Sequence, residues 1–524
     1  MQQNIACEEN SMRAIINKIL LGMMAGCLIT TSIASAQQGP THNVSNNTVT
    51  AYGMTGQAQD QYVPYQPQAI YTNSSYQVVD PMSQMEGLYG QPQAYREMGG
   101  YPQFYGDQYA YGYQPCVSPC YSPRLSCGPW YVTGWIDQGF TWNLDDPSDK
   151  QNGPLRFNDR SNEYQLTQAY LSLGRSVADS GCCWDVGGRV DLLYGADYLW
   201  TSAIGLETHT TWLGVPQEDP AVLLSKWNPN NGPRLEPMRN ASRFGLAMPQ
   251  LYAEMYVPLH LGLNIKAGHF YSIMGYESVM SPQNFFYSHS YSMMYGQPMT
   301  HTGILFSQRL THQLTGIFGL TRGWDTWEDP NGKLSYLAGF RWNSWDRRTE
   351  FSMVAGTGNE TVTDKMGGPG DSTEGAIRTN YSMVLSHQLT PRLKFVTQHD
   401  LGYEKYAAYG NQQNLVDGHW YSFSQYVFYQ LTPKLTLGAR GEWFRDENSC
   451  RIYRMSPIGA VNGSDYSDVT IGLNWKPYDN LVIRPEARWD WSGVHVPGTA
   501  IEGMYDNFSK KSQNTISLSA YVTF

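Results

Sequence analysis

The sequence is poor in charge and in long apolar segments. Charged residues make up 15% of the 524 residues, where about 25% is usual in globular proteins. The net charge of −10 disfavours a nucleic-acid partner, because phosphate binding needs a basic face. The one long apolar stretch, residues 19–33, is shorter than the ~20 residues that a spanning helix needs. A short membrane anchor there is a weaker alternative to an export signal, and no other segment could span a bilayer as a helix. A membrane location would therefore require strands.

Catalytic motifs are also missing. The chain has neither a Gly-x-Ser-x-Gly elbow nor a phosphate-binding loop. His387 and His399, with Asp400, fall on two neighbouring expected strands and leave an outer-membrane hydrolase as a minor alternative. We expect no enzyme activity, no cofactor and no bound metal.

The N-terminus has the pattern of an export signal. Basic residues precede an apolar stretch over 19–33, and Ala34-Ser35-Ala36 then supplies the small residues that signal peptidase reads before Gln37. We expect residues 1–36 to be a signal peptide cleaved between Ala36 and Gln37. A lipid-modified Cys27 is the alternative, although the apolar stretch continues past it.

Residues 37–128 form a low-complexity arm rich in Gln, Tyr, Pro, Gly and Ser, with no Lys and no Trp. Such a composition offers too little aliphatic surface to offset the entropy of ordering, so the arm is expected to be disordered. It is either a spacer or a segment that contacts the cell wall or other chains. Cys116, Cys120 and Cys127 at its end favour disulfides in an oxidising periplasm over a zinc site, because their spacing is unusual for zinc.

From residue 129 onward the sequence predicts about 16 strands of a length that crosses a bilayer. Alternating apolar and polar residues mark these segments, which are 130–142, 163–175, 184–196, 249–258, 262–270, 302–310, 314–322, 335–343, 349–356, 378–389, 393–403, 419–431, 435–445, 467–476, 481–491 and 513–524. The fold class is all-β, a closed antiparallel transmembrane barrel over 129–524.

The connections between these segments alternate in length. Short turns such as Thr390-Pro391-Arg392 and Thr432-Pro433-Lys434 alternate with long loops such as 197–248 and 271–301. Bacterial outer-membrane barrels have short turns on one side and long loops on the other. Proline suits the short turns because it fixes φ and cannot donate to a strand ladder.

The strand faces differ in the way a membrane wall requires. Along 481–491 the apolar residues share one face, whereas Arg484, Glu486 and Arg488 share the other. The last segment alternates down to Val522 and Phe524, which resembles the signal read by the barrel-assembly machinery. Tryptophans near strand ends are expected to form interfacial girdles: Trp130, Trp142, Trp342, Trp475 and Trp489.

Residues 130–524 resemble the OmpL-like putative β-barrel porins of the porin-2 type. The resemblance rests on Gly134-Trp135-Ile136-Asp137, Gln168-Ala169-Tyr170-Leu171, the segment 186–191 and the Leu-Thr-Pro-Lys/Arg-Leu turns. It implies an outer-membrane barrel that passes small solutes. It supplies neither a substrate nor binding residues.

Inward-facing charges are the candidates for selectivity, because a pore of this kind selects by its lining charges. They are Asp137, Arg189, Asp191, Glu254, Lys266, Arg341, Arg378, Arg440, Glu442, Arg484, Glu486 and Arg488. Facing rows of opposite sign would produce a transverse field, whereas pairing across adjacent strands would make the same residues structural. Loop 271–301 either folds inward as a constriction, which we favour, or caps the outer mouth, and the longer loop 197–248 is its rival as a constriction.

The function we expect is a porin-like channel that passes small hydrophilic solutes or ions by diffusion across the outer membrane of a Gram-negative-type envelope. The alternative is a structural or adhesive envelope protein that uses the Tyr-rich arm, with the barrel as anchor. The expected partners are outer-membrane lipid, the assembly machinery, the solutes and, through the arm, the cell wall. A homotrimer is expected by analogy with other porins.

Overall fold

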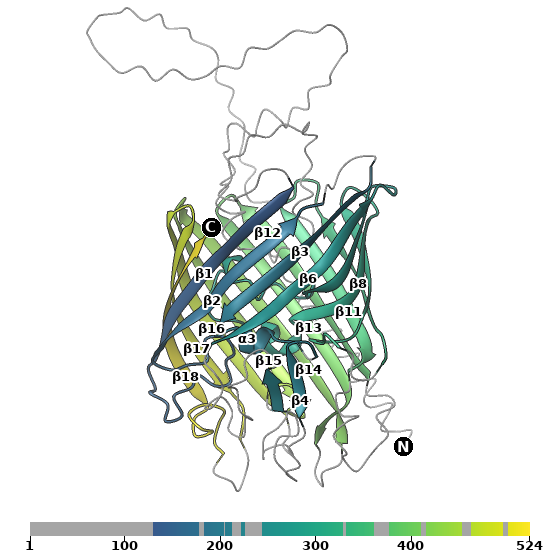
Figure 1. Cartoon of the computed structure of the whole chain (residues 1–524). Coiled ribbons are helices and arrows are strands. Elements are labelled where there is room, and N and C mark those ends of the chain that lie inside the picture. Colours follow the sequence, from purple (N-terminus) through teal and green to yellow (C-terminus); the bar gives the residue numbers. More distant parts are fainter. Residues whose placement is uncertain are drawn as a thin grey trace, which may run out of the picture. The chain divides into compact units, whose positions relative to one another are not determined.

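The structure is a computed structural model whose described residues form a single closed barrel (Figure 1). Described are residues 129–177, 183–203, 205–211, 222–225, 244–328, 332–360, 377–409, 415–452, 463–495 and 501–524. The expected signal peptide with its Ala36–Gln37 cleavage site, the alternative lipid site at Cys27 and the arm with its cysteines lie outside these residues. Their boundaries remain predictions.

Sixteen strands make up the wall, each antiparallel to its neighbours along the chain, and β18 closes the cylinder against β1. They are β1 (Trp130–Asn143), β2 (Glu163–Arg175), β3 (Asp185–Gly195), β6 (Gly245–Val257), β7 (Leu263–Tyr271), β8 (Thr300–Arg309), β9 (Leu314–Thr321), β10 (Ser335–Asn343), β11 (Thr349–Asn359), β12 (Ile377–Thr390), β13 (Leu393–Tyr409), β14 (Leu415–Thr432), β15 (Leu435–Glu447), β16 (Ser464–Tyr478), β17 (Leu481–Ser492) and β18 (Ser512–Thr523).

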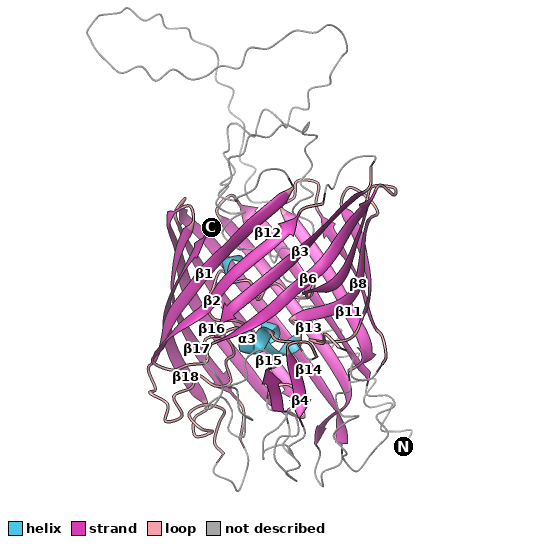
Figure 2. Ribbon diagram, in the orientation of Figure 1, coloured by secondary structure: helices cyan, strands magenta, loops and turns pink. Residues whose placement is uncertain are grey.

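Few other regular elements occur in the described residues. The connection after β3 contains α3 (Tyr198–Thr201) and a separate hairpin of β4 (Thr208–Thr211) and β5 (Val222–Ser225). The connection after β7 contains the short helical turns η3 (Ser281–Gln283) and η4 (Ser292–Gly296). Figure 2 shows the helical turns within the outline of the strand cylinder. In the part of the chain that the structure describes, no helix is long and apolar enough to cross a bilayer.

The predicted strands are confirmed, and the alternation explains which way each side chain points. On β17, Trp489 is exposed on the outer face, whereas Arg488 and Asp490 are buried inside. The predicted girdle tryptophans, listed above, are all exposed. A wall that is apolar outside and charged inside matches a barrel in lipid. Its closure fits the same location, because the unpaired backbone groups of an open sheet edge could not be satisfied in lipid.

The seam between β1 and β18 closes, at the end of the barrel that carries the short turns, through the last residue of the chain. The N–H of Gly134 donates to the carbonyl of Phe524 at 3.0 Å, and the N–H of Phe524 donates back at 2.9 Å. A Cβ at Gly134 would lie 2.2 Å from the carbonyl oxygen of Tyr170 and 2.6 Å from the Phe524 ring. The seam therefore needs glycine there. Recognition of Phe524 and Val522 by the assembly machinery remains a prediction.

Threonine, as well as proline, stabilises the short turns. In the turn between β12 and β13, the hydroxyl oxygen of Thr390 accepts the N–H of Leu393 at 3.1 Å. Thr311 accepts the N–H of Leu314 at 3.0 Å in a turn that has no proline. Threonine side chains commonly satisfy turn backbone in this way. The repeated Leu-Thr-Pro motif thus combines a fixed φ with a side-chain cap.

Several strands extend further than the alternation predicted, and β6, for example, begins at Gly245 rather than at 249. The hairpin of β13 and β14 reaches Tyr409 and Leu415, whereas the sequence suggested ends at 403 and 419. Backbone pairing alone can continue a hairpin beyond the apolar band, where side chains need not alternate. The expected loop 197–248 is likewise partly regular, because it contains α3 and the β4–β5 hairpin.

A buried carboxyl in this outer connection predicts a pH effect on stability. Burial raises the pKa of Glu207 from 4.5 to about 7, although the N–H groups of Ala203 and Met248 donate to it. The folded state therefore binds the proton of the Glu207 carboxyl more tightly than the unfolded state does. The stability that this proton contributes is fully present below pH 4.5 and is lost as the pH rises through about 7. We expect Glu207→Gln to flatten the stability slope between pH 5 and 8 in urea unfolding. Glu502→Gln, at an exposed carboxyl, should leave that slope unchanged.

Candidate functional site: the barrel lumen

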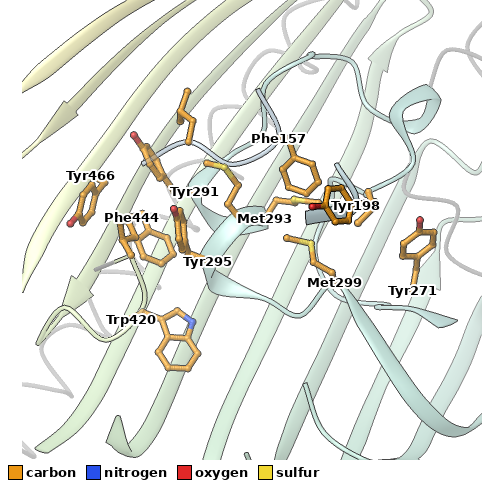
Figure 3. Close-up of a cluster of buried hydrophobic side chains, with 14 of the residues drawn as sticks. Phe157, Tyr198, Tyr271, Tyr291, Met293, Tyr295, Met299, Trp420, Phe444 and Tyr466 are labelled. Carbon is orange, nitrogen blue, oxygen red and sulfur yellow. The ribbon is translucent and has the colours of Figure 1, made fainter. Parts of the chain in front are cut away.

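The connection between β7 and β8, residues 272–299, folds into the barrel, and we call it the lumen loop. Most of its side chains are buried, including Tyr291, Met293 and Tyr295. Figure 3 shows these residues beside Trp420 and Phe444, which come from the wall strands. The prediction that loop 271–301 folds inward is confirmed. Its predicted rival, loop 197–248, is described only in part.

Two wall carboxylates hold the backbone of the lumen loop. Glu442 on β15 accepts the N–H of Ser292 at 2.8 Å and also that of Tyr291. Glu486 on β17 accepts the N–H of Tyr287 at 2.7 Å and that of Ser288 at 3.1 Å. Each carboxylate therefore binds two successive N–H groups. Hydrogen bonds to a charged acceptor are stronger than neutral ones, so these are firm anchors.

Three wall arginines bind carbonyl groups of the same loop. Arg440 donates to the carbonyl of Ser288 at 3.0 Å. Arg488 donates to that of His289 at 2.6 Å. Arg484 donates to the carbonyls of two further loop residues, Ser281 at 3.2 Å and Asn284 at 3.3 Å. The charges predicted to line a wet pore on β15 and β17 thus contact loop backbone instead.

The same arginines form ion pairs with carboxylates of the wall strands. Arg484 lies 2.9 Å from Asp137. Arg440 lies 3.2 Å from Asp468, and Arg488 lies 2.7 Å from Asp490. Positive and negative groups therefore alternate along one wall. The facing rows that would give a transverse field are not formed by these residues, because each charge is paired locally.

The remaining predicted lumen residues also face the interior. Ion pairs join Arg189 to Asp191 at 2.7 Å, Arg378 to Glu404 at 2.9 Å and Arg341 to Glu350 at 3.4 Å. Glu254 on β6 lies opposite Lys266 in the register with β7. The Lys266 ammonium lies 4.2 Å from the centre of the Tyr252 ring. All twelve candidates thus lie on the inner face of the wall. A role for any of them in selectivity remains a prediction.

Glu277 is the one carboxylate of the lumen loop, and it is not among the inward-facing charges predicted from strand alternation. Burial would raise the pKa of Glu277, but Arg440 and His289 hold it at about 2. Arg440 donates to this carboxylate at 2.9 Å, and the Tyr426 hydroxyl donates to it at 3.1 Å. A lone acidic residue in an otherwise uncharged loop, facing a predicted row of arginines, was the signal that could have found it.

Apolar packing completes the attachment of the loop. Tyr276, Phe285 and Phe286 pack against Val396 and Phe428 of the wall. A second cluster joins the beginning of the loop to β8, β10 and β11. The interior is therefore not lined by water along the wall that the loop covers, because aromatic rings exclude water there.

At the outer mouth, aromatic and guanidinium groups form a stack over the loop. Trp324 lies between Arg378 and Arg451, with ring-to-guanidinium distances of 4.6 and 4.5 Å. Arg451 also lies 4.8 Å from the Trp420 ring, and the Trp420 indole donates to the carbonyl of Gly296 at 3.0 Å. Cation–π contacts of this kind gain strength when desolvated, so the outer loops hold the lumen loop from above.

The hydrolase alternative finds no support in the geometry. His387 and His399 lie on the outer face of the wall, where His399 stacks on Tyr381, whereas Asp400 points inward and accepts the Ser422 hydroxyl at 3.0 Å. Adjacent residues of a strand face opposite ways, so the three do not form one site. Among the described residues no group of three His, Cys, Asp or Glu side chains could hold a metal.

Comparisons with known proteins agree with this architecture. Residues 129–524 match the family model described as putative beta-barrel porin-2, OmpL-like. A search of curated proteins gave no match. Among solved structures, the outer membrane channel DcaP of Acinetobacter baumannii is 12% identical with a TM-score of 0.43, over 75% of this chain and 97% of that one. OmpF of Salmonella typhi is 10% identical with a TM-score of 0.45, over 75% and 97%.

The family match covers the whole barrel, from the first strand to the last. The length of this match shows the family, and the closed wall with its inward-facing charges is consistent with it. The chain belongs to the OmpL-like putative β-barrel porin-2 family, and it is a porin-like channel of the outer membrane.

Proposed function

We propose that the barrel passes small hydrophilic solutes by diffusion, through the part of the lumen that the lumen loop leaves open. The observation that carries this is a closed wall of sixteen strands with charged residues on its inner face. A barrel of about 16 strands is wide enough for an aqueous channel, whereas one of about 8 is filled by its own side chains. Diffusion needs no catalytic group, and we assign none.

A planar-bilayer measurement tests the proposal. Purified, folded full-length protein is expected to give stepwise increases in current, and a salt gradient should give a reversal potential that reports ion preference. The control is the same detergent solution without protein. A folded protein that inserts and stays silent would count against a channel. It would favour the anchor function suggested by the arm.

A homotrimer remains a prediction. Cross-linking of the protein in intact outer membranes, followed by mass measurement of the purified complex, would test it.

A further inference from the structure

The inner wall of the barrel is covered unevenly. On β15 and β17, Arg440 and Arg488 are 1% exposed because the lumen loop lies over them. On β10 and β11, the side chains of Arg341 and Glu350 keep 12% and 26% of their surface accessible. Both sets face inward, so the wall stays partly accessible at the inner ends of β10 and β11.

The outer end of that same side has a small hollow, whose lining includes several polar side chains. It is lined by His301, Trp324, Ser335, Glu360, Arg378 and Asn380, among others. Glu360 accepts the N–H of Trp324 at 2.7 Å and the hydroxyl of Ser335 at 2.9 Å. Polar groups thus line the wall both above and below its middle.

The middle of this wall is apolar. Along β10, the inward residues run from Ser335 at the hollow, through Leu337, to Arg341 near the inner end. Leu337 is 2% exposed, as are Leu305 on β8 and Val354 on β11. The three pack in one cluster with Met274 of the lumen loop.

Two glycines leave room for this cluster. A Cβ at Gly319 would lie 3.1 Å from Leu305 Cδ1 and 3.2 Å from Leu337 Cβ. A Cβ at Gly356 would lie 3.1 Å from the Met274 methyl and 3.2 Å from Leu337 Cδ2. The thioether of Met274 therefore lies over Gly356, at the floor of the hollow.

We propose that solutes cross the lumen along the β8–β12 side and that an apolar collar of Met274, Leu305, Leu337 and Val354 is the barrier they must pass. This inference rests on the proposed channel function. Apolar constrictions restrict flow by excluding water from the narrowest section. The collar lies between the hollow at Arg378 and the partly accessible inner end of the wall at Arg341.

Met274 is the movable part of the collar. Its sulfur accepts one hydrogen bond, from the Asn380 amide at 3.2 Å, whereas the later part of the loop is held by ion pairs and carboxylates. Methionine is unbranched and adaptable, so it can swing aside without detaching the loop. A small inorganic ion must lose hydration to pass the collar, so the collar favours organic solutes that present an apolar face.

Single-channel recording on full-length variants tests the collar. We expect Leu337→Ser to raise the potassium chloride conductance roughly threefold to tenfold, because it introduces a hydroxyl at the barrier. Met274→Ala should raise it in the same direction while leaving all wall pairing intact. The control is Val396→Ser, at a buried inward position of β13 on the loop-covered side.

The outcomes separate the two proposals. A rise in both collar variants with no change at Val396→Ser supports the collar, as does a silent wild type that Leu337→Ser makes conductive. A conducting wild type whose conductance is unchanged in both collar variants, or rises equally in the control, overturns the collar and leaves the channel intact. Folded wild type and variants that are all silent overturn the channel itself.

Discussion

Arg440→Ala is expected to lower the free energy of unfolding by about 3–5 kcal/mol, the range seen when one partner of a buried ion pair is removed. The Arg440 guanidinium is fully buried and lies 2.9 Å from Glu277 and 3.2 Å from Asp468. It also donates to the carbonyl of Ser288. Its removal takes an arginine partner from two buried carboxylates and a donor from one loop carbonyl.

Urea unfolding followed by tryptophan fluorescence measures this effect, and Arg445→Ala is the matched control. Arg445 lies on the same strand and pairs with Asp465 at 3.1 Å, but the two side chains are 26% and 50% exposed. Exposed pairs contribute only about 0–1 kcal/mol. Equal losses in the two variants would contradict the account of Arg440 as an anchor.

The dependence of the free energy of unfolding on pH in the acid range provides a second measurement for the same variant. The pKa of Glu277 is lowered from 4.5 to about 2, so its contribution is present above pH 4.5 and is lost as the pH falls toward 2. Without Arg440 the folded-state pKa of Glu277 should rise toward or above its ordinary value. Stability of Arg440→Ala should then depend less on pH between 2 and 4.5 than stability of the wild type does.

The wall was predictable because its physics is local. A strand in lipid must alternate, so the sequence around Arg484 and Arg488 shows which residues face inward without any knowledge of the partner strands. Turn length and the Leu-Thr-Pro motif then give the order of the hairpins. The same rule loses force at the outer ends of β13 and β14, where pairing continues beyond the apolar band.

The groups that the inward charges contact could not be predicted in this way. Alternation places Glu442 in the lumen, but it does not reveal that the N–H groups of Tyr291 and Ser292 lie opposite. Those groups belong to a loop with no period, whose path depends on contacts with many strands at once. For the same reason Glu277 was overlooked, although it is the partner that makes Arg440 a buried anchor.

The double variant Glu442→Gln with Glu486→Gln is expected to raise single-channel conductance about tenfold or more, with larger current fluctuations. Together the two carboxylates hold four backbone N–H groups of the lumen loop. Hydrogen bonds to charged groups contribute about 1.5–3 kcal/mol each, roughly twice the neutral value. Each 1.4 kcal/mol lost shifts the ratio of docked to released loop by about tenfold.

Glu447→Gln serves as the control for this experiment, because Glu447 lies at the outer end of β15 and accepts the Tyr421 hydroxyl rather than the loop. The conductance of the Glu447→Gln variant should match that of the wild type. If the double variant also matches the wild type while remaining folded, the carboxylates do not hold the loop in place. The apolar contacts of Phe285 and Phe286 with the wall would then be sufficient. A loop held by charge detaches when the charge is removed, whereas a loop held by burial does not.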